Sequence, residues 1–102
     1  MITFKHISVA DCQVIMQSNT RARMIDIRDL AHFNAGHVEA SYHFQEDTFA
    51  AFLEKVKWDD PIIVICYRGN SSQIFAQQLS DLGYLNVYNL MGGYTAWKTM
   101  TI

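Results

Sequence analysis

The most constraining feature of this chain is an uninterrupted β-branched run, Ile62–Ile65, between Pro61 and Cys66. A strand of this composition has no polar face, so both of its faces must be buried. Such strands form the centre of parallel sheets that helices cover on both sides. Polar residues follow from Tyr67 to Ser72, and a segment with helical periodicity comes next. The run therefore predicts a central strand that leads through a short loop into a helix.

Strand and helix patterns alternate along the rest of the chain. Strands are expected over residues 4–7, 24–27, 41–44, 62–66 and 86–90, and apolar residues recur at helical spacing between them. Candidate helix caps are Ser8, Asp29, Asp47 or Thr48, and the pair Ser71 and Ser72, while Gly36 and Gly83 are candidate helix ends. This alternation predicts an α/β fold with a central, mainly parallel sheet of five strands and helices on both faces.

Length and composition limit the possible classes of protein. We expect the 102 residues, half of them hydrophobic, to form a single domain over 1–102. The longest apolar run falls short of the roughly 18 residues of a membrane span, and the first residues lack the apolar core of a signal peptide. We therefore expect a cytoplasmic protein without membrane contact. A net charge of −2 and scattered basic residues argue against nucleic-acid binding.

Cys66 is the candidate nucleophile. It ends the central strand, at the sheet edge where open α/β proteins bind ligands, and Arg28 and the turn 91–93 are expected at the same edge. Gly69 permits a tight loop whose backbone N–H groups, backed by a helix N-terminus, form an anion-binding concavity. Such a cup favours a thiolate and suits a persulfide anion, and Arg68 is expected to lower the thiol pKa further. The loop therefore predicts sulfur chemistry.

Three stretches of the chain resemble motifs of one family. They read Asp26-Ile27-Arg28 followed by Phe33-Asn34-Ala35-Gly36-His37-Val38, then Cys66-Tyr67-Arg68-Gly69-Asn70-Ser71, and finally Leu90-Met91-Gly92-Gly93-Tyr94-Thr95-Ala96-Trp97. Their order and spacing resemble a single domain of the rhodanese family, the sulfurtransferases, and the cysteine loop looks most like that of the small bacterial GlpE-type enzymes. The chain departs from the family at Glu39-Ala40-Ser41, where the family has Pro-Gly-Ala, so we expect a different loop path there.

The resemblance implies a thiosulfate sulfurtransferase that works by double displacement. A Cys66 persulfide would pass its sulfur to a thiophilic acceptor, which is cyanide in an assay and a dithiol such as thioredoxin in a cell. No cofactor is implied. The substrate-binding residues would be Tyr67, Arg68, Gly69, Asn70, Ser71, Ser72 and Arg28.

Several other residues have structural interpretations. We expect Asp26 to form a structural ion pair, His37 to be a hydrogen-bonded loop histidine, and Cys12, Tyr94 and Trp97 to belong to the core. The histidines at positions 32, 37 and 43 lack the spacing of metal ligands, so no metal is predicted.

Two other functions fit the same loop less well. A phosphatase or arsenate reductase of the Cys-x5-Arg type needs an arginine where this chain has Ser72. A persulfide carrier, or a rhodanese-like module that binds a dedicated protein partner, would carry the same loop as an enzyme. Turnover that one protein acceptor stimulates far more than small thiols would identify a carrier.

Overall fold

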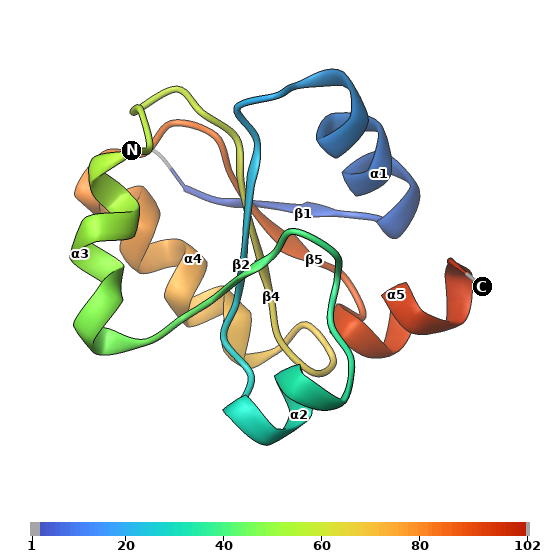
Figure 1. Ribbon diagram of the computed structural model, residues 1–102. Helices are drawn as coiled ribbons and strands as arrows, with labels where there is room; N and C mark the ends of the chain where they lie inside the picture. Colours follow the sequence, from blue (N-terminus) through green and yellow to red (C-terminus); the bar gives the residue numbers. More distant parts are fainter. Residues whose placement is uncertain (1–2, 102) are drawn as a thin grey trace.

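Strands and helices alternate from end to end in the computed structural model, which describes residues 3–101 (Figure 1). The strands are β1 (Lys5–Ile7), β2 (Arg23–Asp26), β3 (Tyr42–His43), β4 (Ile62–Ile65) and β5 (Val87–Leu90). The helices are α1 (Val9–Ser18), α2 (Leu30–Ala35), α3 (Glu46–Glu54), α4 (Ser71–Leu82) and α5 (Gly93–Met100). The sheet order is β1-β5-β4-β2-β3, and every pairing between the described strands is parallel. The predicted α/β architecture is confirmed.

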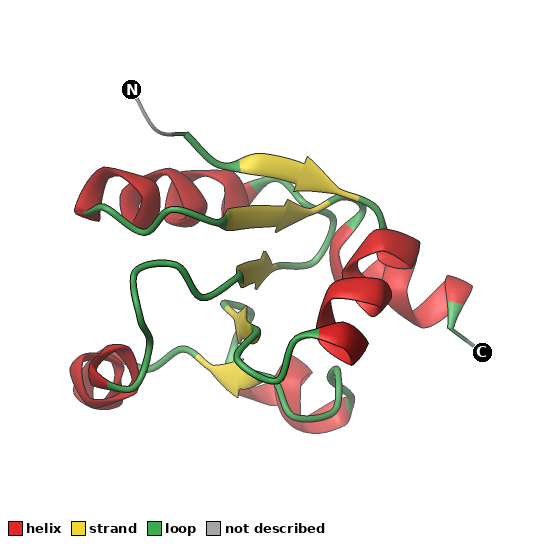
Figure 2. Ribbon diagram, turned by 90° about the horizontal axis from the view of Figure 1, so that it is seen from above, coloured by secondary structure: helices red, strands yellow, loops and turns green. Residues whose placement is uncertain are grey.

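β4 lies at the centre of the sheet because all four of its side chains are apolar and buried. Ile63 and Ile65 pack with α1 and α5 on one face, whereas Ile62 and Val64 pack with α3 and α4 on the other. Figure 2 shows the two helical layers on either side of the sheet. This period of two divides the apolar residues between two core clusters.

Most of the predicted helix ends are confirmed. Ser8 caps α1 by accepting a hydrogen bond from the Asp11 N–H, and Asp29 caps α2 by accepting one from the His32 N–H. Gly83 ends α4 with a left-handed φ of 112°. Gly36 ends α2 with an extended backbone instead, and a Cβ there would lie 2.8 Å from the Tyr94 hydroxyl oxygen, so the Tyr94 side chain would have to shift.

Two predicted caps are wrong. α3 begins at Glu46 after an extended Gln45, so Asp47 lies inside the first turn, where its charge still favours the helix N-terminus. α4 is preceded by Asn70, whose side chain makes no cap hydrogen bond, and Ser71 and Ser72 are the first two helical residues. The Ser72 hydroxyl does not cap the helix because it is hydrogen-bonded to buried side chains.

The strand order brings three loops to one edge of the sheet. β2, β4 and β5 are neighbours, and their carboxyl ends lead to Arg28, Cys66 and the turn at Met91–Gly93. This is the edge at which ligands bind in parallel α/β sheets. No helix in the described part of the chain is long and apolar enough to cross a membrane.

Candidate active site

Cys66 directly follows β4, and only 2% of the residue is exposed. Its Sγ donates a hydrogen bond to the Ser72 Oγ, with 3.0 Å between the two atoms. The Gly69 N–H donates to the same sulfur over 3.1 Å. The loop therefore folds back over the sulfur, and the first turn of α4 closes the other side.

Helix α5 fixes the direction of the loop peptides. The Tyr94 N–H donates to the Cys66 carbonyl over 2.8 Å, and the Thr95 N–H donates to the Tyr67 carbonyl over 3.1 Å. In a trans peptide the N–H points opposite to the carbonyl, so the N–H groups of Tyr67 and Arg68 point away from α5. The first turn of α5 thus orients consecutive amides of the loop, as an anion-binding cup requires.

Two glycines allow this close packing. A Cβ on Gly93 would lie 2.5 Å from the Cys66 carbonyl oxygen, and one on Gly69 would lie 3.0 Å from the Gly92 nitrogen. Both glycines have left-handed φ angles, 57° for Gly93 and 88° for Gly69. The turn at 91–93 lies at the expected edge of the sheet, and Gly93 packs against the backbone of the cysteine loop.

The environment of Cys66 favours its thiolate. Burial alone would raise the pKa of the thiol, but hydrogen bonds with the side chains of Ser72 and Ser71 and with the N–H groups of Ser72 and Gly69 outweigh it, so the pKa lies below its ordinary value. The lowering of this pKa that was expected of Arg68 stays a prediction. Its exposed side chain makes no hydrogen bond or ion pair with residues 3–101, and the largest causes that lower the pKa are the hydrogen bonds around the sulfur.

A buried hydrogen-bond network extends from the sulfur to β5. The Ser72 hydroxyl donates to the Asn89 Oδ1, and the Asn89 Nδ2 donates to the Gly69 carbonyl over 3.2 Å. Sequence reasoning missed Asn89, which stands 17 residues beyond Ser72 and 20 beyond Gly69. The available signal was a polar residue at a core position of a strand.

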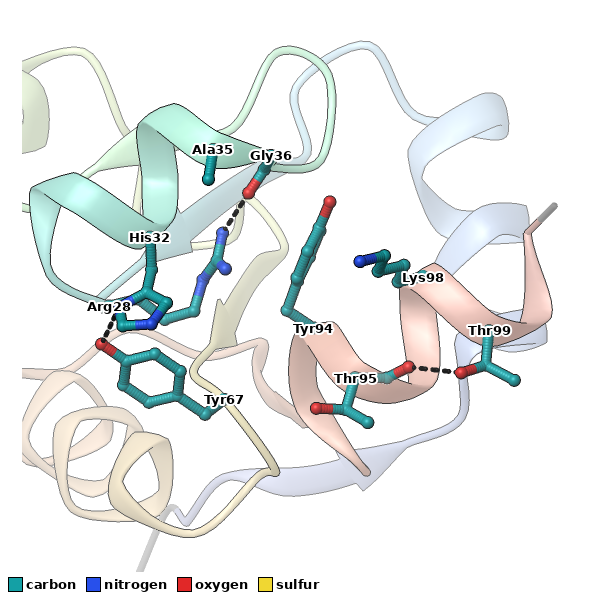
Figure 3. A pocket seen from close by; sticks show the side chains of 9 residues that line it. All are labelled: Arg28, His32, Ala35, Gly36, Tyr67, Tyr94, Thr95, Lys98 and Thr99. Atoms are coloured by element: carbon teal, nitrogen blue, oxygen red, sulfur yellow. Dashed lines mark hydrogen bonds between the residues drawn. The ribbon is translucent and has the colours of Figure 1, made fainter.

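A pocket of about 610 Å³ adjoins the loop at Tyr67, between α2 and α5 (Figure 3). Its lining combines aromatic rings with basic and hydroxyl side chains: Arg28, His32, Ala35, Gly36, Tyr67, Tyr94, Thr95, Lys98 and Thr99. The Tyr67 hydroxyl donates to the Asp29 carboxylate over 2.7 Å, and this carboxylate lies 2.8 Å from the His32 Nδ1. Hydrogen bonds from the His32 N–H and the Tyr67 hydroxyl hold the pKa of Asp29 below its usual range.

Arg28 is a buried partner of Asp26. Its guanidinium donates to the Asp26 carboxylate over 2.8 Å and to the Gly36 carbonyl over 2.7 Å, and it lies 4.0 Å from the centre of the Tyr94 ring. The structural ion pair predicted for Asp26 is confirmed. Arg28 lines the pocket at the same time, but the carboxylate beside it compensates its charge.

The remaining predicted residues take mainly structural positions. The His37 Nδ1 lies 2.7 Å from the Phe33 carbonyl, as expected of a hydrogen-bonded loop histidine. Cys12 is fully buried, and burial raises its pKa to about 12. Trp97 packs against the core, whereas Tyr94 packs against the core and also forms part of the pocket wall.

The comparisons with known proteins agree with this arrangement. The family model of the Rhodanese-like domain matches residues 8–100. A protein named thiosulfate sulfurtransferase GlpE from Tolumonas auensis is 37% identical, with 96% of this chain and 92% of that protein covered. The protein of the same name from Shewanella oneidensis is 38% identical, with 95% of each covered.

The fold also matches that of a solved relative. The human single-domain sulfurtransferase TSTD1 superposes with a TM-score of 0.78 at 23% identity, and 93% of this chain and 96% of that chain are covered. At this identity the match concerns the fold alone. Together with the family model and the two bacterial relatives, it leads to one conclusion: the chain belongs to the rhodanese family.

Proposed function

We propose that this protein, as one domain over residues 1–102, is a thiosulfate sulfurtransferase with Cys66 as its nucleophile. The observation that carries the proposal is the sulfur itself, which sits inside a closed loop, accepts a hydrogen bond from the Gly69 N–H, donates one to the Ser72 Oγ and has a lowered pKa. A thiolate is the reactive form of cysteine, and a lowered pKa increases the share of the thiol in that form. The names of the two bacterial relatives support thiosulfate as the donor.

The reaction proceeds in two displacements. In the first, the Cys66 thiolate attacks the outer sulfur of thiosulfate, a sulfur–sulfur bond forms, and sulfite leaves with the electron pair of the broken bond. In the second, a nucleophilic acceptor attacks the terminal sulfur of the persulfide and regenerates the thiolate. With cyanide the product is thiocyanate, and with a dithiol such as thioredoxin it is a persulfide of the acceptor. Both steps balance without a cofactor, and ping-pong kinetics follow.

The loop residues stabilise the anionic sulfur species. The N–H groups of Gly69 and Ser72 act on the sulfur as the donors of an oxyanion hole act on an alkoxide, and the loss of one such donor costs about 10²–10³ in rate. Tyr67 anchors the loop to Asp29, and the exposed Arg68 can meet the sulfonate oxygens of the donor. We propose that Arg28 contributes mainly by holding Asp26 and the end of α2 beside the pocket.

The narrow approach to Cys66 favours this donor over a phosphate ester. A residue that is 2% exposed is reached by a single protruding atom such as the outer sulfur of thiosulfate. A Cys-x5-Arg phosphatase needs a guanidinium six positions after the cysteine, where this chain has Ser72, whose hydroxyl oxygen accepts a hydrogen bond from the sulfur. The reactive thiol also suits a reducing compartment, and we propose a cytoplasmic location.

Steady-state kinetics test the proposal. Thiocyanate formation from thiosulfate and cyanide should give parallel double-reciprocal lines, and Cys66→Ser should abolish turnover. Cys12→Ser is the matched control, because Cys12 is fully buried on the α1 side of the core and should not be required. Turnover that survives Cys66→Ser would refute the proposal. Turnover with one protein acceptor only would identify a persulfide carrier.

A further inference from the structure

Asn89 is a buried polar residue on the face of β5 that packs against α4. Asn89 is 1% exposed. Val87, two residues earlier and so on the same face of the strand, packs in an apolar cluster with Ala76 and Leu79 of α4. Central parallel strands are normally apolar on both faces, and a buried amide needs hydrogen-bond partners. The hydrogen bonds that Asn89 makes should therefore explain why a polar residue occupies this position.

The partners of Asn89 fix the orientation of its amide. One side of the group faces the Gly69 carbonyl at 3.2 Å, and a carbonyl oxygen can only accept, so this side is the Nδ2 donor. The same Nδ2 lies 3.1 Å from the His6 Nδ1. The oxygen of the amide therefore faces the Ser72 hydroxyl and can only accept its proton.

Ser72 has a single hydroxyl proton and two neighbours that can accept it. While Cys66 is a thiol, the network is complete: Sγ donates to the Ser72 Oγ, and the Ser72 hydroxyl donates to the Asn89 Oδ1. Once Cys66 loses its proton, the sulfur can only accept. The thiolate and the Asn89 oxygen then compete for one proton, and one of two buried acceptors loses a partner.

We propose that Asn89 is a positioning residue that acts on Cys66 through Ser72 by competing with the free thiolate for the serine proton. In the persulfide, Sγ is a bonded, uncharged sulfur, so the Ser72 proton can return to the Asn89 Oδ1. The free thiolate is thus less stabilised than it would be if Ser72 donated to it alone, which favours its attack on the donor. The catalytic part of this inference rests on the sulfurtransferase function proposed above.

The structure offers a specific replacement. In Asn89→Leu the Gly69 carbonyl keeps its hydrogen bond from the Gln73 Nε2, at 2.9 Å, and the exposed His6 can bond to water. Only Ser72 loses a partner, and its proton becomes available to the thiolate. Asn86→Leu is a matched control, because the Asn86 amide donates to the Asp59 carbonyl, away from the loop.

The test is the pH dependence of Cys66 alkylation by iodoacetamide, followed by mass spectrometry of the Cys66 peptide. In Asn89→Leu we expect the midpoint to fall by about one pH unit. The limiting rate at high pH should fall about threefold, because nucleophilicity decreases with thiol pKa. Ser72→Ala should raise the midpoint, the double variant should match Ser72→Ala, and Asn86→Leu should match the wild type. An unchanged or higher midpoint in Asn89→Leu, or additive effects in the double variant, would overturn the inference.

A measurement on the unaltered protein covers the case in which Asn89→Leu does not fold. The ¹³C resonance of the Asn89 side-chain carbonyl should shift with pH at the midpoint of Cys66 alkylation, and this shift should be absent in Cys66→Ser. A resonance that does not follow the Cys66 titration would overturn the inference. Neither experiment uses thiosulfate. Both could therefore be interpreted even if the protein did not transfer sulfur from thiosulfate.

Discussion

Replacement of Gly93 by alanine should disable the active-site loop while the rest of the fold persists. The new Cβ would lie 2.5 Å from the Cys66 carbonyl oxygen, 2.6 Å from the Tyr67 carbonyl carbon and 2.7 Å from the Arg68 nitrogen. All three atoms belong to the backbone, so no flexible side chain can move aside. Ordinary contacts of a Cβ begin at 3.4 Å. The loop and the first turn of α5 must therefore separate.

The magnitude follows from this geometry. The separation has to increase by about 1 Å, and a displacement of that size in a reacting group costs on the order of 10²-fold in rate. Overpacking destabilises by about 1–3 kcal/mol, and a left-handed alanine adds about 1–2 kcal/mol. We expect kcat/KM for thiosulfate to fall about 100-fold and the free energy of unfolding to fall by about 2–5 kcal/mol.

Thiocyanate formation and urea unfolding measure the two effects separately. Gly83→Ala is the control, because Gly83 also has a positive φ, 112°. Its Cβ would meet only the Trp58 ring, at 3.6 Å, and Gly83 lies at the end of α4 opposite to the cysteine loop. Gly83→Ala should lose about 1–2 kcal/mol of stability and keep its kcat/KM. If Gly93→Ala retained activity within threefold of Gly83→Ala, the account of how α5 holds the loop would be refuted.

Three further predictions concern stability, each measured by urea unfolding. Arg28→Met should destabilise by about 3–5 kcal/mol, because it leaves the Asp26 carboxylate buried without its partner, and a loss below 1 kcal/mol would contradict this. Burial raises the pKa of Cys12 from 9.0 to about 12, so as the pH rises the unfolded state loses this proton before the folded state does. The free energy of unfolding that the buried thiol contributes is therefore complete below pH 9 and declines between pH 9 and pH 12. Cys12→Val should lack that decline. If the free energy of unfolding fell equally in the wild type and in Cys12→Val between pH 9 and pH 12, this contribution of Cys12 would be excluded. Ala40, which stands where the family has glycine, has a left-handed φ of 67°, so Ala40→Gly should stabilise by about 0.5–1 kcal/mol, and a destabilised variant would argue against strain there.

Local patterns in the sequence predicted most of the fold. The buried run Ile62–Ile65 determined the central strand, and the caps at Ser8 and Asp29 marked two helices to the residue. These features depend on neighbours within one turn of helix or on strand periodicity. The prediction failed at Ser71 and Ser72, since a serine before a helical pattern is normally read as a cap. The competing partners of Ser72 come from elsewhere in the chain.

The details of the site depend on contacts that no local pattern encodes. Tyr67 meets Asp29 across 38 positions, and Asn89 meets His6 across 83. The sequence also placed Arg68 beside the cysteine, whereas the largest causes that lower the Cys66 pKa are hydrogen bonds with residues three to six positions further on. The position of Cys66 at the carboxyl end of the central strand could be predicted, whereas the groups that tune its pKa required the three-dimensional arrangement.

The central claim is that Cys66 carries sulfur as a persulfide. Intact-protein mass spectrometry without reductant tests it most directly, on wild type, Cys12→Ser and Cys66→Ser after incubation with thiosulfate and then with cyanide. Wild type and Cys12→Ser should gain the mass of one sulfur atom and lose it to cyanide as thiocyanate forms, while Cys66→Ser should gain nothing. No gain in wild type, or a gain that persists in Cys66→Ser, would contradict the proposed mechanism.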